Sequence, residues 1–121
     1  MKRILIALLA LMPVGAAEAP VVLYPGLGAW HHAIATRNPD AQKFFDQGLS
    51  LLYGFNRYEA LRSFRKAAEL DAQAAMAYWG IAMALGPHVN MDGDGDVDLK
   101  AGCEALQTGL RLTGVAAGER A

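Results

Sequence analysis

The chain has 121 residues, a formal net charge of −1 and 54% hydrophobic residues. This length allows one domain, and the near-neutral charge argues against broad electrostatic binding to nucleic acid or to an anionic membrane. The single cysteine, Cys103, excludes an internal disulfide bond. Because Cys103 falls on the apolar stripe of a predicted helix, we expect a buried thiol, with an intermolecular or redox role as the alternative.

Residues 1–19 have the features of a secretory signal peptide. A basic start precedes an apolar core at residues 4–12, which is too short to span a bilayer as a mature helix. Small residues then offer cleavage after Ala16, Ala17 or Ala19. We therefore predict a bacterial protein that is periplasmic or secreted and keeps no membrane attachment after cleavage. A short anchor that is never cut is the alternative.

Residues 20–39 show no regular periodicity, and Pro25-Gly26 is a turn signal. We expect an irregular arm that covers part of the exposed face of the first helical hairpin. The adjacent His31 and His32 offer two ligands for zinc or copper. Neighbouring side chains of an extended segment point to opposite sides, however. The alternative is therefore a polar pair that hydrogen-bonds the arm to the hairpin.

Two amphipathic helices joined by a tight turn are predicted next. The first, over about residues 40–54, begins after the capping residue Asn38 and ends near Gly54. The second begins at Asn56, which Glu59 follows as in a capping box. So short a turn leaves the two helices antiparallel. The apolar residues of the first helix share one face and are Ala41, Phe44, Phe45, Gly48, Leu51 and Leu52.

This stretch resembles a tetratricopeptide repeat, a unit of about 34 residues in which two helices cross at small side chains. Gly48 and Ala60 match its two small positions, and Phe64 and Ala67 follow at the family's spacing. The pattern recurs one unit later. The second copy aligns Tyr78 with Phe44, Ala82 with Gly48 and Leu85 with Leu51.

The resemblance implies an all-α fold, a short α-solenoid of about two tetratricopeptide-like antiparallel hairpins preceded by the irregular arm. The helical domain spans residues 40–114, with repeat 1 at about 41–74 and repeat 2 at about 75–114. An unrelated helical hairpin is the alternative. A second resemblance, over about residues 24–90, is to exported bacterial proteins known only as repeat-containing, and it implies no assigned reaction.

Residues 74–86 are apolar or glycine throughout, which predicts a buried core helix covered on several sides. This segment is too short for a membrane span. Its large side chains Met76, Tyr78, Trp79 and Met83 would suit a cofactor or peptide pocket. Their helical spacing favours core packing instead.

An acidic loop, residues 87–98, is inserted where an ordinary repeat has a short turn. Its carboxylates Asp92, Asp94 and Asp96 match the first three ligand positions of a calcium-binding EF-hand loop. The loop has valine at the position that requires glycine, and it lacks the bidentate glutamate. We therefore favour a solvated turn in which Asp96 or Asp98 caps the next helix. An atypical calcium site is the alternative.

The last helix covers about residues 99–112 and is stopped by Gly114. Gly102 and Gly109 weaken this helix or allow close packing. Its expected inward stripe is Leu99, Cys103, Leu106, Leu110 and Thr113. No polar capping helix follows in the tail, residues 115–121. Three interpretations of this uncapped end remain. The chain is a truncated or divergent short form, which we favour, or a homo-oligomer through the exposed end, or it is stabilised by the arm alone.

Stacked hairpins form a concave surface, lined by their first helices, that holds extended peptides or partner segments. We expect polar side chains there to bind the partner. They are Gln42, Lys43, Asp46, Gln47 and Ser50, with Asn56 and Arg57 at the far rim. Such amides and charges suit hydrogen bonds to a peptide backbone or a carboxylate. The prediction is a non-catalytic protein- or peptide-binding scaffold without a cofactor.

The alternative function is that of a metal-binding periplasmic protein or a metal-dependent enzyme. Zinc or copper would bind the histidines, and calcium would bind the aspartate loop. The ligands would come from His31, His32, His88, Asp92, Asp94 and Asp96. Against catalysis, the sequence shows no nucleophile beside a base, no phosphate-cradling glycine loop and no ligand cluster at helical spacing.

Overall fold

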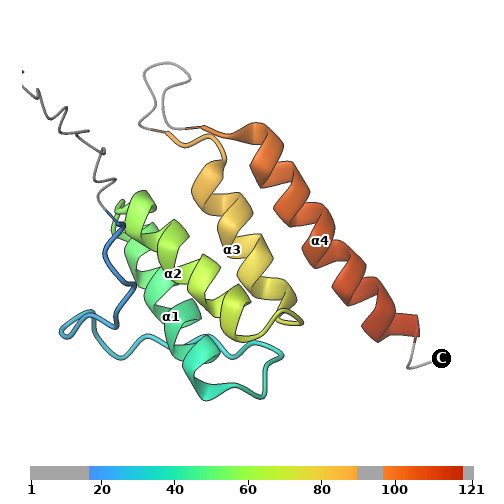
Figure 1. The fold of residues 1–121 in the computed structure, drawn as a ribbon, viewed down its shortest axis with the longest axis horizontal. Helices are drawn as coiled ribbons and strands as arrows, with labels where there is room; N and C mark the ends of the chain where they lie inside the picture. The colour runs from blue at the N-terminus through green and yellow to red at the C-terminus, as the bar shows by residue number, and fades with distance from the viewer. Residues whose placement is uncertain (1–16, 90–96, 119–121) are drawn as a thin grey trace, which may run out of the picture.

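The structure is a computed structural model that describes residues 17–89 and 97–118. In this part of the chain it contains α-helices and no strands. The helices are α1 (Pro39–Tyr53), α2 (Arg57–Leu70), α3 (Ala75–Leu85) and α4 (Leu99–Gly118). They lie side by side in chain order, and the arm runs along α1 and α2, at the opposite end of the row from α4 (Figure 1). The prediction of an all-α fold is confirmed for these residues.

The ends of α1 are set by local hydrogen bonds. Asn38 caps the start, where its side-chain oxygen accepts from two free amides at 3.0 Å and 3.2 Å. At the other end, the amide of Asn56 bonds to the carbonyl of Leu51 at 2.9 Å, as in a Schellman motif. The left-handed residue of this motif is Phe55, at φ 63°, whereas the expected stop Gly54 has φ −82°. The chain therefore places an exposed phenylalanine where glycine is usual.

One ring, Phe64 of α2, lies at the meeting point of three helices and is fully buried. It lies between Gly48 of α1 and Gly80 of α3. A Cβ atom added at Gly48 would come within 2.6 Å of the ring, and one added at Gly80 within 2.4 Å. Because neither position has room for a side chain, glycine at both lets the three helices approach closely.

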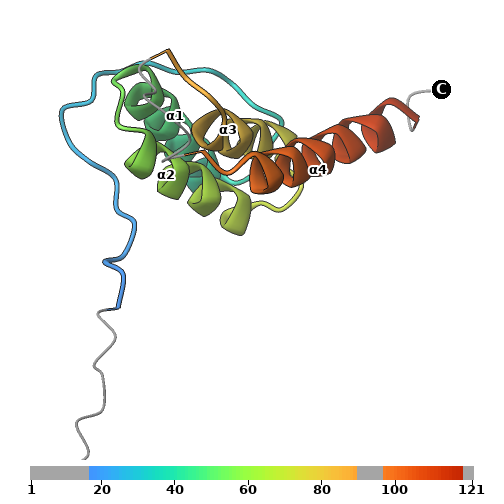
Figure 2. The ribbon, with the colours of Figure 1, turned by 90° about the horizontal axis from the view of Figure 1, so that it is seen from above.

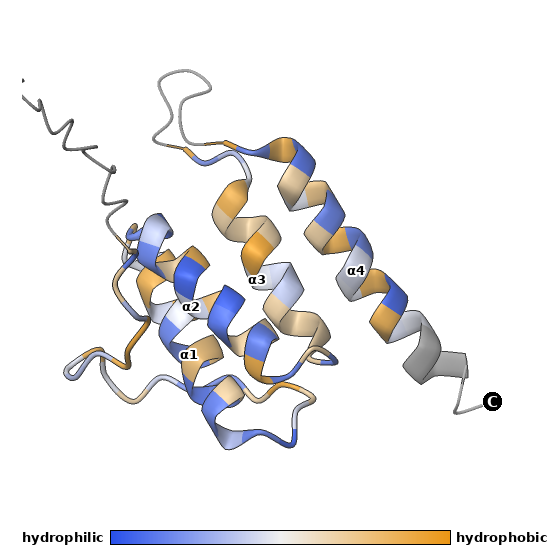
Figure 3. Ribbon diagram, in the orientation of Figure 1, coloured by the Kyte–Doolittle hydropathy of each residue, from blue (hydrophilic) through white to orange (hydrophobic). Residues whose placement is uncertain are grey.

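The hydrophobic core lies between α1, α2 and α3, while the outer face of α2 is polar (Figure 3). All six residues of the apolar face predicted for α1 are buried, which confirms that face. The largest side chains of the core are Phe44, Phe45, Leu49, Leu51, Leu52, Phe64, Ile81 and Leu85.

The helix α3 contacts α1, α2 and α4, as expected of a helix covered on several sides. One face nevertheless stays open, where Met83 is 46% exposed and Met76 and Trp79 are half-buried. The end of α3 is held by Arg57, whose guanidinium donates to three of its terminal carbonyls, including that of Met83 at 2.8 Å. This contact satisfies acceptors that a helix end leaves unpaired. Burial lowers the pKa of Arg57.

The helix α4 runs to Gly118, so the predicted stop at Gly114 is wrong. The helix is also rotated about its own axis relative to the prediction. Leu99, Leu106 and Leu110 of the expected inward stripe are 59%, 42% and 61% exposed. Cys103 and Thr113 of the same stripe are exposed as well. The prediction of an inward stripe is therefore wrong, and so is the prediction of a buried thiol.

Two glycines explain this orientation. Gly102 and Gly109 are buried against α3, and a Cβ atom added at Gly109 would lie 3.0 Å from the carbonyl oxygen of Ala75. Seven residues apart, they share one face of the helix. The backbones approach closely along that face, so the leucines are left on the other side. Among the helices α4 packs on α3 alone, and its C-terminal turns extend past the other helices (Figure 2).

Several predicted features lie outside the described residues. They are the apolar core of the signal peptide, most of the acidic loop with Asp92, Asp94 and Asp96, and the last residues of the tail. None of the helices in the described part of the chain is long and apolar enough to cross a membrane.

Candidate functional site

A buried glutamine of α1 binds the main chain of the arm. Gln47 is 6% exposed, although the sequence predicts an exposed position. Its amide group donates to the carbonyl of Val22 at 2.9 Å and accepts from the amide of Tyr24 at 2.7 Å. It also donates to Oγ of Ser63 in α2 at 3.0 Å. Gln47 therefore joins the arm to both α1 and α2.

Two further side chains of α1 bind the arm closer to its end. Gln42 accepts from the amide of Ile34 at 3.0 Å and donates to the carbonyl of His32 at 2.9 Å. Asp46 accepts from the amide of His32 at 3.0 Å, and its other oxygen lies 2.7 Å from Nδ1 of His31. Together with Gln47, these side chains bind five main-chain groups. The helix α1 thus holds an irregular peptide segment, which is the chain's own arm.

The other residues expected to bind a partner have different surroundings. Lys43 pairs with Asp40 at 2.9 Å on the surface. Asn56 caps α2, and Arg57 binds the end of α3. Ser50 is half-buried and lines an open hollow next to the arm. Of these four residues, Ser50 therefore fits a partner-binding position best.

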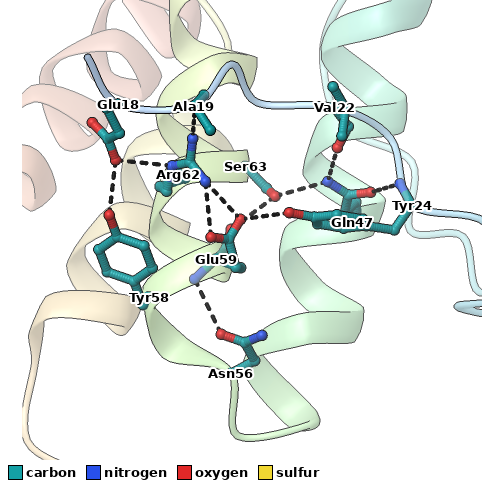
Figure 4. A network of polar contacts seen from close by, with 10 residues as sticks. All are labelled: Glu18, Ala19, Val22, Tyr24, Gln47, Asn56, Tyr58, Glu59, Arg62 and Ser63. Atoms are coloured by element: carbon teal, nitrogen blue, oxygen red, sulfur yellow. Dashed lines mark hydrogen bonds and ion pairs between the residues drawn. The ribbon is translucent and has the colours of Figure 1, made fainter. Parts of the chain in front are cut away.

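Arg62 of α2 binds Glu18 and Ala19, the two residues just before the arm (Figure 4). Its Nε lies 3.0 Å from the carboxylate of Glu18, and its guanidinium also donates to the carbonyl of Ala19. On the other side it donates to both oxygens of Glu59, at 2.8 Å and 3.1 Å. The bond to Glu59 raises the pKa of Arg62. Arg62 is therefore a permanent cation between two carboxylates.

Two tyrosines extend this network. The hydroxyl of Tyr24 donates to Glu59 at 2.9 Å, and that of Tyr58 donates to Glu18 at 2.9 Å (Figure 4). These hydrogen bonds are the main cause that raises the pKa of each phenol above its ordinary value of 10.0. Both phenols therefore remain protonated donors at neutral pH. Side-chain contacts thus supplement the main-chain contacts of the arm.

An apolar cavity of about 220 Å³ lies between α1, α3 and the arm. We call it the aromatic cavity, and its lining is Trp30, His32, Phe45, Leu49, Tyr53, Met76 and Trp79. Both tryptophans of the chain belong to this lining. Trp30 is 61% exposed and Tyr53 is 71% exposed, so the cavity opens to solvent. Large, exposed aromatic side chains around one hollow are typical of an interaction site.

The sequence predicts only part of this cavity. Met76 and Trp79 suggest a pocket, but their helical spacing favours the core, and Trp30 lies far away in an irregular segment. One feature of the sequence does relate two of the lining residues. Phe45 and Trp79 are separated by the repeat period of about 34 residues, so a repeat places them on the same face of successive hairpins.

The two adjacent histidines do not converge on one point. His31 lies against Asp46, whereas the ring of His32 packs near that of Phe45, with centroids 6.2 Å apart. Among the described residues, no three His, Cys, Asp or Glu side chains are grouped so as to hold a metal ion. The aspartate loop lies outside the described residues, so the calcium prediction stays a prediction.

A wider hollow of about 980 Å³ lies at the N-terminal end of α1. Three of its polar side chains, those of Thr36, Asn38 and Asp71, have structural partners. Thr36 donates to Asp71, and Asn38 donates to the carbonyl of Leu70 at 3.1 Å. These contacts tie the end of the arm to the end of α2. We therefore take the aromatic cavity, beside the polar side chains of α1 that bind the arm, as the candidate site.

Comparison with known proteins adds no relative. No protein-family model matches the chain, and no match was found among curated proteins or among solved structures. The functional proposal therefore rests on the geometry of the site and on the sequence pattern.

Proposed function

We propose that the protein is a non-catalytic binding scaffold, exported from the bacterial cytoplasm, that holds a protein or peptide segment. In this proposal the helices form two tetratricopeptide-type hairpins, α1–α2 and α3–α4. The position of Phe64 between Gly48 and Gly80 supports it, because stacked repeats need close packing between successive hairpins. The shared cavity of Phe45 and Trp79 supports it as well.

One observation carries the proposal: side chains of α1 already bind peptide main chain. Gln42, Asp46 and Gln47 hold five main-chain groups of the arm. Of the arm's own side chains, Val21 and Ile34 pack against the core, while most of the larger ones stay exposed. Main-chain hydrogen bonds combined with pockets for side chains are the usual means of holding an extended peptide. The aromatic cavity provides an open pocket next to this surface.

Selection from a random peptide library tests the proposal. We expect the purified mature protein to select peptides that bind reversibly with a Kd on the order of 10 µM, about −7 kcal/mol. Mass spectrometry after incubation should find the selected peptide unchanged. A library that yields no binder would contradict a peptide-binding scaffold, and a peptide that is cleaved or modified would contradict a non-catalytic one.

Elemental analysis of the same preparation tests the metal-binding alternative. We expect zinc, copper and calcium well below one atom per chain. A metal that stays bound at close to one atom per chain after gel filtration would favour the alternative, with ligands from the aspartate loop or the histidines.

Export is tested by the N-terminus of the mature protein. We expect signal cleavage after Ala16 or Ala17, which keeps Glu18 in place to contact Arg62 and Tyr58. Intact-mass measurement of the protein from a periplasmic extract reads this directly. Full-length protein found in the cytoplasm alone would contradict export.

A further inference from the structure

Among the residues that the structure describes, the lining of the aromatic cavity carries no carboxylate, lysine or arginine. The carboxylate of Asp46 contributes no atom to this lining and is already engaged. It receives hydrogen bonds from the amide of His32 and the side chain of Gln42, and it lies against His31. A positively charged ligand would find aromatic faces in the cavity, but no opposite charge. The chemistry of the wall therefore matches a neutral apolar group.

The size of the cavity limits that group. Its volume of about 220 Å³ is below the roughly 300–1,000 Å³ of pockets that enclose drug-sized ligands. A second, shallower hollow shares Trp30 and Tyr53 with it and adds Leu27, Ser50 and Gly54. The cavity thus has room for one large side chain, and the hollow beside it leaves an open path for main chain, with the hydroxyl of Ser50 along it.

We propose that the aromatic cavity is the anchor site for one large neutral side chain, such as leucine, methionine or phenylalanine, of an extended partner segment. The segment's main chain runs over the adjoining hollow at Ser50. This inference rests on the proposed function and names the chemistry of the ligand. Trp30 and Tyr53 close over the anchor, as exposed aromatic side chains commonly do at the centre of an interface.

The arm takes part in this site because it supplies one wall. Trp30 precedes His31 and His32, whose contacts with Asp46 and Gln42 fix the arm on α1. Asp46 is therefore a positioning residue for Trp30. The cavity is complete only while the arm is docked.

Tryptophan fluorescence is a specific reporter, since the chain's two tryptophans both line the cavity. The full mature protein is titrated with N-acetyl-leucinamide and N-acetyl-phenylalaninamide. We expect a saturable emission shift with a Kd in the millimolar range, as small ligands of this size allow. N-acetyl-glycinamide and N-acetyl-lysinamide should bind at least about tenfold more weakly, because the first buries little apolar area and the second would have to desolvate its ammonium group.

Tetramethylammonium chloride is the probe for the competing chemistry, since aromatic rings also attract cations. A response to tetramethylammonium that is tighter than the response to N-acetyl-leucinamide would overturn the proposal. So would the absence of any response to the apolar probes. If library peptides still bind in that case, the anchor site fails while the scaffold stands. If neither the probes nor any library peptide bind, both fail.

A matched pair of variants tests the location. Tyr53→Ala removes an exposed wall of the cavity and should weaken binding of N-acetyl-leucinamide at least about fivefold, without changing the thermal melt. Phe55→Ala removes an equally exposed ring that does not line the cavity, and it should bind as the unaltered protein does. Equal binding by Tyr53→Ala and Phe55→Ala would place the probe elsewhere and overturn the proposal.

Discussion

At the scale of single residues, the packing of the helices depends on two glycines, which have no side chain. Phe64 occupies space that a Cβ atom at Gly48 or Gly80 would need. The two glycines lie on α1 and α3, far apart in the chain, and a Cβ atom added at either would meet the same two ring atoms, Cδ1 and Cε1. Their absent side chains therefore decide how closely three helices approach. Elsewhere glycine in a helix is a cost of about 1 kcal/mol relative to alanine.

Gly80→Ala tests this packing. The added methyl group overlaps the ring of Phe64, and overpacking of this kind costs about 1–3 kcal/mol, more than alanine gains in helix propensity. We expect a net loss of up to about 2 kcal/mol in the free energy of unfolding, measured by denaturant titration. Gly114→Ala is the control, because nothing lies within 4 Å of its added Cβ atom. It should stabilise the protein, and a Gly80→Ala variant as stable as Gly114→Ala would contradict the packing.

The two phenols of the arm's network give a prediction for pH. Hydrogen bonds to Glu59 and Glu18 raise the pKa values of Tyr24 and Tyr58 above 10.0, their value in the unfolded chain. The stabilising contribution of a raised group is fully present below the unfolded pKa and is lost as pH rises through the folded pKa. We expect the start of the arm to stay docked up to about pH 10 and to detach above it. Tyrosinate absorbance and arm proteolysis measure the two events. Ionisation of these phenols below pH 10.0 would contradict the assigned bonds.

At the scale of elements, the arm behaves as a bound peptide that is part of the chain. It has no helix or strand of its own, and side chains of α1 bind five of its main-chain groups. Gln47 is central, since it is buried and joins the arm to both helices. Removal of its amide leaves partners at Val22 and Ser63 without their bond.

Gln47→Ala should therefore release the first half of the arm. Buried groups left unpaired cost about 1–3 kcal/mol, so we expect a loss of that size in the free energy of unfolding. Hydrogen exchange at the amide of Tyr24 should become fast. Gln107→Ala makes the same change on the exposed surface of α4 and should leave both measurements as they were. A slow Tyr24 amide in Gln47→Ala would contradict the role given to this glutamine.

The sequence predicted α1 and α2 well because both have strong periodicity and recognisable caps. It could not predict the orientation of α4, which has two competing faces. Its leucines suggest an inward stripe, but Gly102 and Gly109 allow a closer approach of backbones, and the closer approach prevails. The arm's contacts also escape prediction, since an irregular segment has no period that relates Trp30 or His32 to α1.

The aromatic cavity of the candidate site could not be predicted from the sequence for a similar reason. Its walls come from three segments that are separate in the chain, and Trp30 reaches it through the arm alone. Of the seven polar residues expected to bind a partner, five lie on α1. Three of them, Gln42, Asp46 and Gln47, bind the arm. Their amide and carboxylate groups suit a peptide main chain, but the sequence does not show that this main chain is the arm.

At the scale of the whole molecule, the arm covers one end of the helical row, and no other described segment covers the outer face of α4 at the other end (Figure 1). We expect weak self-association through the leucine stripe of α4, because exposed apolar side chains gathered on one face favour association. Sedimentation velocity should show a concentration-dependent coefficient. Leu106→Glu should abolish that dependence and change the free energy of unfolding by less than about 0.5 kcal/mol, since the residue is exposed. A monomer at every concentration would contradict this use of the stripe.

Calorimetric titration of the mature protein with a library-selected peptide tests the central claim most directly, because one experiment reports binding, apolar burial and chemistry. We expect one peptide per chain, a negative heat-capacity change from burial of the peptide's apolar anchor, and an unaltered peptide mass afterwards. Heats that do not saturate, or a peptide recovered cleaved or modified, would contradict a scaffold that binds without catalysis.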